Sequence, residues 1–192
     1  MPIKIITEVS ARHVHLCKKD LEKLFGKGYN LTPIRDLSQP GDFAAQETLT
    51  IKTAKSRIDN VRIIGPLRKK TQVEIAVTDA YTLGIVPPIR VSGDLKGSTG
   101  ATLIGPKGKV DLKEGVIIAK RHIHASPKDA RKYNLKNGQT VSVKIKEGKR
   151  RLIFNDVIVR VSPRYLWRFQ IDTDEANAAG VVRMTEGEVI KK

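Results

Sequence analysis

The sequence contains one short motif twice, and this repeat constrains what the chain can form more than any other feature. The copies are Arg12-His13-Val14-His15 and Arg121-His122-Ile123-His124, and they start 109 residues apart. In each copy a Cys or Ser follows two residues after the second histidine, and an Asp stands three residues further on. All four histidines of the chain lie in these copies. Random placement would rarely produce two matched pairs, so the repeat predicts a functional site.

The spacing of the histidines has a chemical meaning if the backbone is extended. In a strand, residues i and i+2 point to the same face, so His13 and His15 would present two imidazoles side by side, as would His122 and His124. Two imidazoles on one face are a common partial ligand set for zinc or another divalent transition metal. The alternative is that surface histidines flank a core residue by chance. The duplication favours a metal-binding or catalytic role.

The composition points to anionic partners. The chain has 192 residues, enough for one large domain or two small ones. It carries 36 Lys and Arg against 20 Asp and Glu, a net charge of +16, which suits nucleic acid or a phosphate-rich small molecule. The four tyrosines are not interleaved with the basic residues as a base-stacking platform requires, so we expect no nucleic acid. A basic β-barrel that binds RNA or DNA, with a structural metal on the histidines, stays as the alternative.

Targeting signals are sparse. No run of about 18 apolar residues predicts a transmembrane helix, and the N-terminus lacks the pattern of a signal peptide. The single cysteine, Cys17, cannot form an internal disulfide, which suits a reducing compartment. We therefore expect a cytoplasmic protein with no membrane partner.

The strand pattern predicts a mainly β protein in two parts. Short β-branched segments recur about every ten residues between turn formers, which is typical of a barrel or a sandwich. Each His-x-His follows a strand and precedes a short helix. The expected strands are 3–9, 48–51, 61–64, 73–77, 101–104, 116–119, 140–145, 152–154 and 157–161. The expected short helices are 21–25, one starting at Ser126, 162–167 and 173–179, whereas 181–192 shows no clear pattern.

Several other residues have side chains suited to a site. A zinc site usually takes three or four protein ligands, and Glu74, in an apolar strand segment, is either a ligand or an ordinary outward-facing residue. Arg68, Lys69 and Lys70 lie in one turn. Arg68 could form a bidentate pair with a phosphate, although a solvated basic turn would look the same. Asp172 could orient a histidine through a hydrogen bond, whereas Asp174 and Glu175 are typical of a helix N-terminus.

Five segments together resemble a known family. They are 12–16, 31–41, 65–75, 120–124 and 171–178. Their sequences, such as Arg-His-Val-His-Leu, Gly-Pro-Leu-Arg-Lys-Lys-Thr-Gln-Val-Glu-Ile and Ile-Asp-Thr-Asp-Glu-Ala-Asn-Ala, resemble the PduL-type phosphotransacylases, or phosphate propanoyltransferases. The resemblance covers nearly the whole chain, with the motifs in the same order.

The resemblance implies an architecture. It implies two closely packed β-barrel domains with short capping helices and an active site between them. One barrel would combine 1–11 with 120–192, and the other would contain 12–119. The histidine motifs would then lie where the chain crosses from one barrel to the other.

The resemblance also implies a dinuclear zinc site. The metal ligands that carry over to this sequence are His13, His15 and Glu74 for one zinc, and His122 and His124 for the other. The family completes the second set with a histidine just before the Ile-Asp-Thr-Asp segment, but this chain has Gln170 there. An amide oxygen is a weaker zinc ligand than an imidazole. We therefore expect Gln170 to weaken the second metal site.

The function implied is the reaction of an acyl-CoA with phosphate to give an acyl phosphate and CoA. The acyl group would be short, propanoyl or acetyl, and Arg68 matches the family's phosphate-binding arginine. The expected partners are acyl-CoA, CoA, phosphate and acyl phosphate, and a homo-oligomer is compatible with the sequence. Family members in bacterial microcompartments carry an N-terminal targeting extension that is not seen here, which favours the cytoplasm. Gln170 leaves a degenerate, CoA-binding relative as a further alternative.

Overall fold

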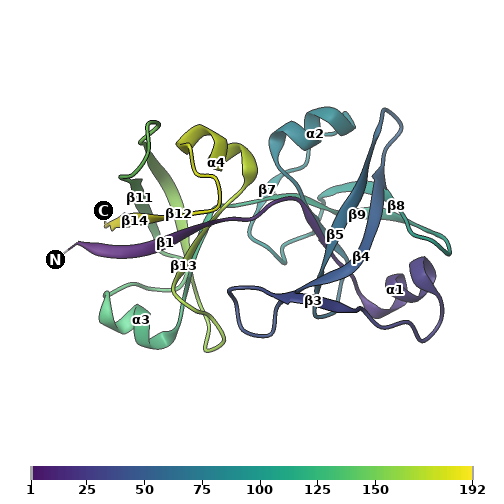
Figure 1. Ribbon diagram of the computed structural model, residues 1–192, viewed down its shortest axis with the longest axis horizontal. Helices are drawn as coiled ribbons and strands as arrows, with labels where there is room; N and C mark the ends of the chain where they lie inside the picture. The colour runs from purple at the N-terminus through teal and green to yellow at the C-terminus, as the bar shows by residue number, and fades with distance from the viewer. Residues whose placement is uncertain (1, 192) are drawn as a thin grey trace. The chain divides into compact units, whose positions relative to one another are not determined.

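The chain forms two compact units, each closed around its own core. The structure is a computed structural model that describes residues 2–191, and these form fourteen strands and four short helices. One unit combines Met1–Ala11 with Lys120–Lys192, and the other is Arg12–Ala119. Figure 1 labels most of the strands and helices of the two units, and its colour bar locates the others along the chain. The expectation of a mainly β fold built from two β-barrels with short helices is confirmed.

The unit of residues 12–119 is built on a ring of six strands. Its elements are β2 (His13–His15), α1 (Lys18–Phe25), β3 (Pro33–Asp36), β4 (Phe43–Lys52), β5 (Arg57–Gly65), β6 (Gln72–Glu74), α2 (Val77–Leu83), β7 (Ile89–Arg90), β8 (Thr99–Ile104) and β9 (Lys109–Ala119). Around the ring the order is β4-β5-β2-β6-β9-β8, and β8 pairs back with β4. Strand β3 adds to β4 and β7 adds to β9 outside the ring.

The other unit is a closed six-stranded barrel as well. Its elements are β1 (Ile3–Val9), β10 (His122–Ala125), α3 (Pro127–Lys132), β11 (Thr140–Ile145), β12 (Ile153–Val161), β13 (Arg168–Ile171), α4 (Thr173–Ala179) and β14 (Met184–Ile190). The order around the barrel is β1-β13-β10-β12-β11-β14, and β14 pairs back with β1.

The two rings have the same topology. Strand β2 is parallel to β5 and antiparallel to β6, and β10 is likewise parallel to β12 and antiparallel to β13. The next strand, β9 or β1, is parallel to β6 or β13. Both strands that directly precede a histidine motif in the sequence, β1 and β9, therefore complete the ring that contains the other motif. The repeat seen in the sequence therefore lies at the same place in two barrels of the same strand arrangement.

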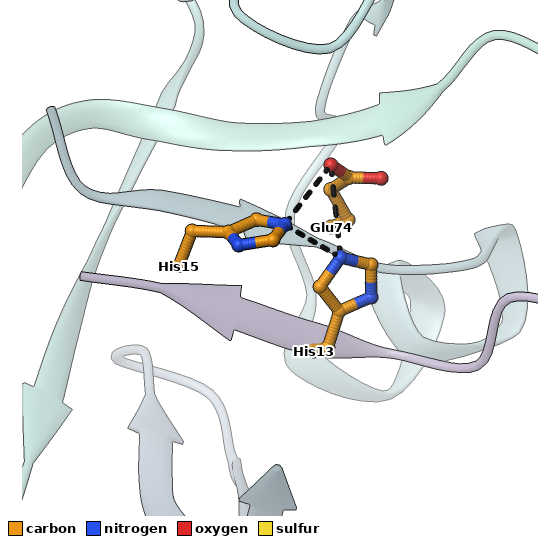
Figure 2. A group of neighbouring side chains, drawn as sticks. All are labelled: His13, His15 and Glu74. Atoms are coloured by element: carbon orange, nitrogen blue, oxygen red, sulfur yellow. Dashed lines mark hydrogen bonds and ion pairs between the residues drawn. The ribbon is translucent and has the colours of Figure 1, made fainter. Parts of the chain in front are cut away.

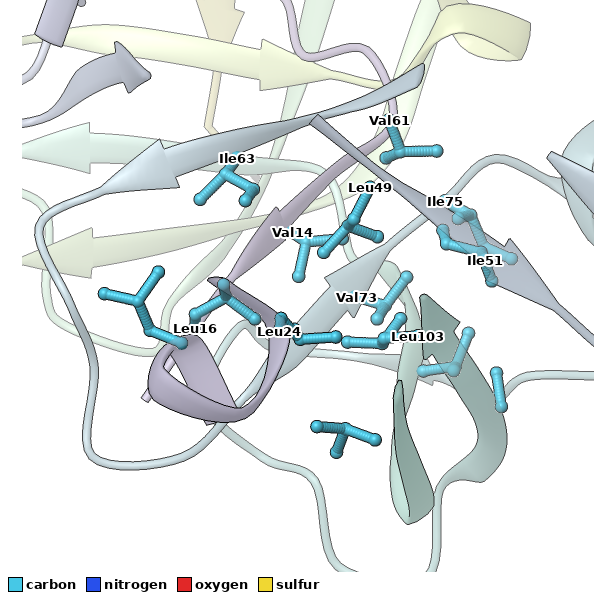
Figure 3. Packing of buried hydrophobic residues seen from close by; sticks show 14 of the residues in the cluster. Val14, Leu16, Leu24, Leu49, Ile51, Val61, Ile63, Val73, Ile75 and Leu103 are labelled. Carbon is cyan, nitrogen blue, oxygen red and sulfur yellow. The ribbon is translucent and has the colours of Figure 1, made fainter. Parts of the chain in front are cut away.

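Each histidine strand is held in place by an apolar residue between its histidines. Val14 and Ile123 are completely buried, each in the core of its own unit. Figure 3 shows Val14 packed among Leu49, Ile63 and Val73 from neighbouring strands. Because successive residues of a strand point to opposite faces, burying the central residue turns both histidines away from the core.

The helices begin where the local chemistry favours them, with two corrections to the sequence-based expectations. Segment 73–77 is not one strand: β6 ends at Glu74, and α2 begins at Val77, because the Asp79 carboxylate accepts the Ala76 N–H at the helix start. Segment 162–167 is a turn and not a helix, closed by the Tyr165 N–H to the Ser162 carbonyl.

Segment 181–192, which shows no clear pattern in the sequence, contains strand β14. No helix within residues 2–191 has the length and apolar character to cross a membrane.

Candidate metal centre

Three side chains of the unit of residues 12–119, called the central unit below, converge on one point. His13 and His15 lie on β2, and Glu74 stands opposite His13 on β6. The two Nε2 atoms are 3.1 Å apart, and Glu74 Oε1 lies 3.7 Å from that of His13 and 3.9 Å from that of His15 (Figure 2). Two ligands of a tetrahedral zinc, each at its usual bond length, stand about 3.3 Å apart. The three ligand atoms are therefore spaced as for a common ion.

The electrostatics of these side chains suit metal ligation. Burial would raise the pKa of Glu74, but His13, with its charge and hydrogen bond, and the charges of His15 and Arg68 bring it well below the usual value. Burial, together with His13 and Arg68, lowers the pKa of His15 to about 3. Glu74 is thus a carboxylate and His15 a neutral imidazole, which are the protonation states that bind a metal.

The tautomer of His15 is fixed by the backbone. His15 Nδ1 lies 3.0 Å from the carbonyl oxygen of Ile64. A carbonyl only accepts hydrogen bonds, so Nδ1 carries the proton and the Nε2 lone pair faces the other two ligand atoms. Metal-binding histidines typically make such a bond from their second ring nitrogen.

A polar network that sequence reasoning missed holds Glu74. Ser92 Oγ donates to Glu74 Oε1 at 2.9 Å, and Gln72 Nε2 donates to both Ser92 and Glu74. The Gly93 N–H in turn donates to Gln72 Oε1 at 2.8 Å. Gln72 stands two residues before Glu74 and therefore on the same strand face, which was a usable signal. Ser92 lies far away in the sequence, in a loop, and nothing local marks it.

Arg68 is joined to this network, whereas its basic neighbours are not. Its Nη1 donates to Ser92 Oγ at 3.1 Å, and its backbone N–H donates to the Leu16 carbonyl at 2.9 Å. Lys69 and Lys70 are exposed, and Lys70 pairs with Glu114. The structure thus brings Arg68 to the side chains that hold Glu74.

The second histidine pair repeats the first, but its surroundings differ. His122 Nε2 and His124 Nε2 are 3.1 Å apart, and His122 Nδ1 lies 2.9 Å from the Lys120 carbonyl. Gln170 stands opposite His122, at the position that Glu74 occupies in the other barrel. The His124 ring lies against the Tyr165 ring, with centroids 4.1 Å apart.

Gln170 faces an acid from a third strand. Its Nε2 donates to Glu8 Oε2 at 2.7 Å, and Arg168 Nε donates to the other oxygen at 2.9 Å. Within residues 2–191, the one group of three or more His, Cys, Asp or Glu side chains spaced for a metal is that of His13, His15 and Glu74. The side chain opposite His122 is therefore an amide, where the other barrel has a carboxylate. Asp172 accepts the Glu175 N–H and begins α4.

Comparison with known proteins identifies the family of this chain. Residues 6–182 match the family model for phosphate propanoyltransferase. A phosphate propanoyltransferase of Thermotoga maritima is 57% identical over 175 residues, which are 91% of this chain and 83% of that protein. One of Listeria monocytogenes is 51% identical over 185 residues, 96% of this chain and 86% of that protein. The chain therefore belongs to the phosphate propanoyltransferase family of acyltransferases.

Proposed function

We propose that this chain is a zinc-dependent phosphate acyltransferase, which interconverts a short-chain acyl-CoA and phosphate with an acyl phosphate and CoA. The relatives are named for the propanoyl reaction. The observation that carries the zinc dependence is the convergence of His13, His15 and Glu74 on one point. CoA, phosphate and acyl phosphate are all anions, which suits the net charge of +16.

The donor set of His13, His15 and Glu74 fits a catalytic zinc. Three protein ligands of nitrogen and oxygen leave the fourth tetrahedral position open for a substrate atom. A zinc ion in this place would stabilise the CoA sulfur as a thiolate, as metals do for coordinating thiols. Ser92 and Gln72 hold the Glu74 carboxylate in the ligating position, which is the task of outer partners at metal sites.

Arg68 positions the phosphate in this proposal. Its guanidinium can form two parallel hydrogen bonds to phosphate oxygens and neutralise their charge. A phosphate oxygen then attacks the thioester carbonyl carbon, the carbon–sulfur bond breaks, and CoA leaves as the thiolate. Both nucleophiles are substrates, so no acyl-enzyme is required. Fixing the orientation of the phosphate lowers the entropic part of the activation free energy.

The second pair, His122 and His124, is proposed as a weaker metal site completed by Gln170. The Gln170 amide nitrogen donates to Glu8, so its carbonyl oxygen is the atom left to bind a metal. A neutral oxygen binds zinc less tightly than a carboxylate or an imidazole. The complete set of ligands in the other barrel supports turnover even where this site is poorly filled.

The test is acyl transfer to CoA from acetyl phosphate and from propanoyl phosphate. Metal-stripped protein is assayed with and without added zinc, and thioester formation is followed. We expect turnover that requires zinc. The two acyl groups differ by one methylene, which is worth about 1–3 kcal/mol of discrimination, so their relative rates define the chain length preferred. Folded, zinc-reloaded protein without turnover would support the degenerate, CoA-binding alternative instead.

A further inference from the structure

The arginine before the first histidine motif is tied to the start of a helix. Arg12 Nε and Nη2 lie 2.8 and 2.7 Å from Asp79 Oδ1. Asp79 is in the first turn of α2, and its other oxygen accepts the N–H of Ala76, the residue that precedes the helix, at 3.1 Å. One carboxylate therefore bonds both to the residue that directly precedes the histidine strand β2 and to the helix start.

The second motif makes the same set of contacts with a different acid. Arg121 Nε lies 3.1 Å from Glu175 Oε1, and Glu175 Oε2 accepts the N–H of Asp172 at 3.0 Å. Glu175 occupies the same position in α4 as Asp79 does in α2. The acid changes from Asp to Glu, but the division of its two oxygens between the arginine and the helix start is the same in both barrels.

The position of this contact relates it to the ligands. His13 directly follows Arg12 and stands opposite Glu74, which is two residues before Ala76. The ion pair therefore completes a closed ring of contacts. The ring runs from Arg12 to His13 along the chain, across the strand pair to Glu74, and back to Arg12 through the start of the helix. The other barrel contains the same ring of contacts, formed by Arg121, His122, Gln170, Asp172 and Glu175.

The strands that bear the three side chains are short, so this ring of contacts can restrain them. Strands β2 and β6 have only three residues each, so few ladder hydrogen bonds fix one against the other. A metal centre requires its ligands to be held to within about 0.5 Å. Asp79 is buried, with 5% of its side chain exposed, so its charge needs the partner that Arg12 provides. The ion pair thus restrains the ends of both ligand strands.

We propose that Arg12 and Arg121 are positioning residues, each of which holds the first histidine of its pair opposite its cross-strand partner. Arg12, through Asp79, sets the metal affinity of the His13, His15 and Glu74 site. Arg121, through Glu175, acts in the same way on the second pair. This inference rests on the proposed function, because it assumes that His13, His15 and Glu74 bind zinc.

The test is a zinc titration of metal-stripped, full-length protein, followed by nitrogen-15 NMR of the imidazoles. The chain has only four histidines, so each ring can be assigned by single substitution and each site is read separately. We expect Arg12→Ala to shift the zinc midpoint of His13 and His15 at least about tenfold upward, as loss of an outer partner does. The resonances of the second pair should titrate as in the wild type.

Matched variants separate positioning from simple stabilisation. Arg121→Ala removes the equivalent ion pair and should leave the His13 and His15 midpoint unchanged. Arg12→Lys keeps the charge and should recover part of the affinity, whereas Arg12→Met keeps only the aliphatic stem and should not. Denaturant unfolding of the same samples gives the stability. Because the Arg12 side chain is 46% exposed, we expect these variants to fold.

Two results would overturn the inference in distinguishable ways. If Arg12→Ala lowers stability but leaves the zinc midpoint of His13 and His15 as in the wild type, the ion pair is only a structural contact. If His13 and His15 of the wild type do not respond to zinc, the metal site of the proposed function fails, and the positioning role fails with it.

Discussion

The two barrels place the same histidine pair in the same strand but complete it with different chemistry. Opposite His13 stands Glu74, a buried carboxylate held by Ser92. Opposite His122 stands Gln170, a neutral amide that donates to Glu8. Both imidazole pairs have the same 3.1 Å separation of their Nε2 atoms. The duplicated fold therefore fixes the geometry of a site, and a single cross-strand position decides its charge.

The carboxylate near each histidine pair comes from a different strand in the two units. In the central unit the carboxylate comes from β6 itself, whereas in the other unit it comes from Glu8 on β1, the neighbour of β13. There it bonds to Gln170 and Arg168. A carboxylate that is occupied by an arginine and an amide is a poor metal ligand, because the metal must replace both bonds. We thus expect the two sites to differ in affinity by much more than their similar geometry would indicate.

The largest effect is expected from making the first site resemble the second. Glu74→Gln keeps the size of the side chain but removes the charged ligand. We expect zinc affinity at His13 and His15 to fall at least about 100-fold, because a lost ligand should cost more than the 10–100-fold of a lost outer partner. Thioester formation should fall with it. Imidazole NMR and turnover are measured together, and an unchanged zinc midpoint would remove Glu74 from the ligand set.

The loops before the two cross-strand residues carry arginines at matching positions. Arg68 stands six residues before Glu74, and Arg164 stands six residues before Gln170. We expect Arg68→Ala to lower kcat/KM for phosphate by about 100-fold, as the loss of one charge-stabilising donor does, with zinc content unchanged. Arg164→Ala, the matched control, should stay within about twofold, since we assign it no contact with the phosphate. Equal losses in both variants would contradict the assignment of phosphate binding to Arg68.

The second site should be strengthened by an imidazole. Gln170→His supplies a third nitrogen ligand beside His122 and His124, and we expect zinc retained after dialysis to rise toward about two ions per chain. Elemental analysis of the dialysed protein measures the ratio, and Gln170→Ala controls for loss of the amide. A stoichiometry that does not change in Gln170→His would show that this position is not at the metal.

The smallest effect is expected at Glu8. Glu8→Gln weakens its bonds to Arg168 and Gln170, and we expect unfolding free energy to fall by about 1–3 kcal/mol. The control is Glu186→Gln, which breaks the exposed ion pair with Lys4, a residue of the same strand as Glu8. This change should lower the unfolding free energy by about 0–1 kcal/mol. Urea denaturation compares the two variants. Equal costs would mean that the Glu8 contacts are no stronger than an exposed ion pair.

Local pattern located most of the longer strands and gave the histidine geometry, but it missed β3, β7 and β14 and extended β6 into the start of α2. The alternation in His13-Val14-His15 predicts a buried valine and two histidines on the other face, and the structure confirms that Val14 is buried between them. The helix start at Ser126 is confirmed too, because Ser126 accepts the Asp129 N–H and Pro127 occupies the first turn. Local pattern failed at 162–167, where Ser-Pro favours a helix start but the strands on either side require a turn.

The residues that surround the candidate site were beyond local pattern. Glu74 and Arg68 were assigned through the resemblance, since a glutamate in an apolar strand and an arginine in a basic turn are ambiguous by themselves. Ser92, Glu8 and Asp79 were not assigned to the site at all. Each reaches its partner from a segment far away in the sequence.

The sequence by itself determined which side chains are present for the candidate site. It also determined how each histidine pair is spaced, because this depends on neighbouring residues of one strand. Only the tertiary structure decided that Glu74 faces His13, that Gln170 faces His122 and donates to Glu8, and that Arg12 reaches Asp79. The physical reason is register. Which residues of two distant strands stand opposite each other is fixed when the whole barrel closes around its core, and a shift of one residue would turn every side chain of a strand to the other face.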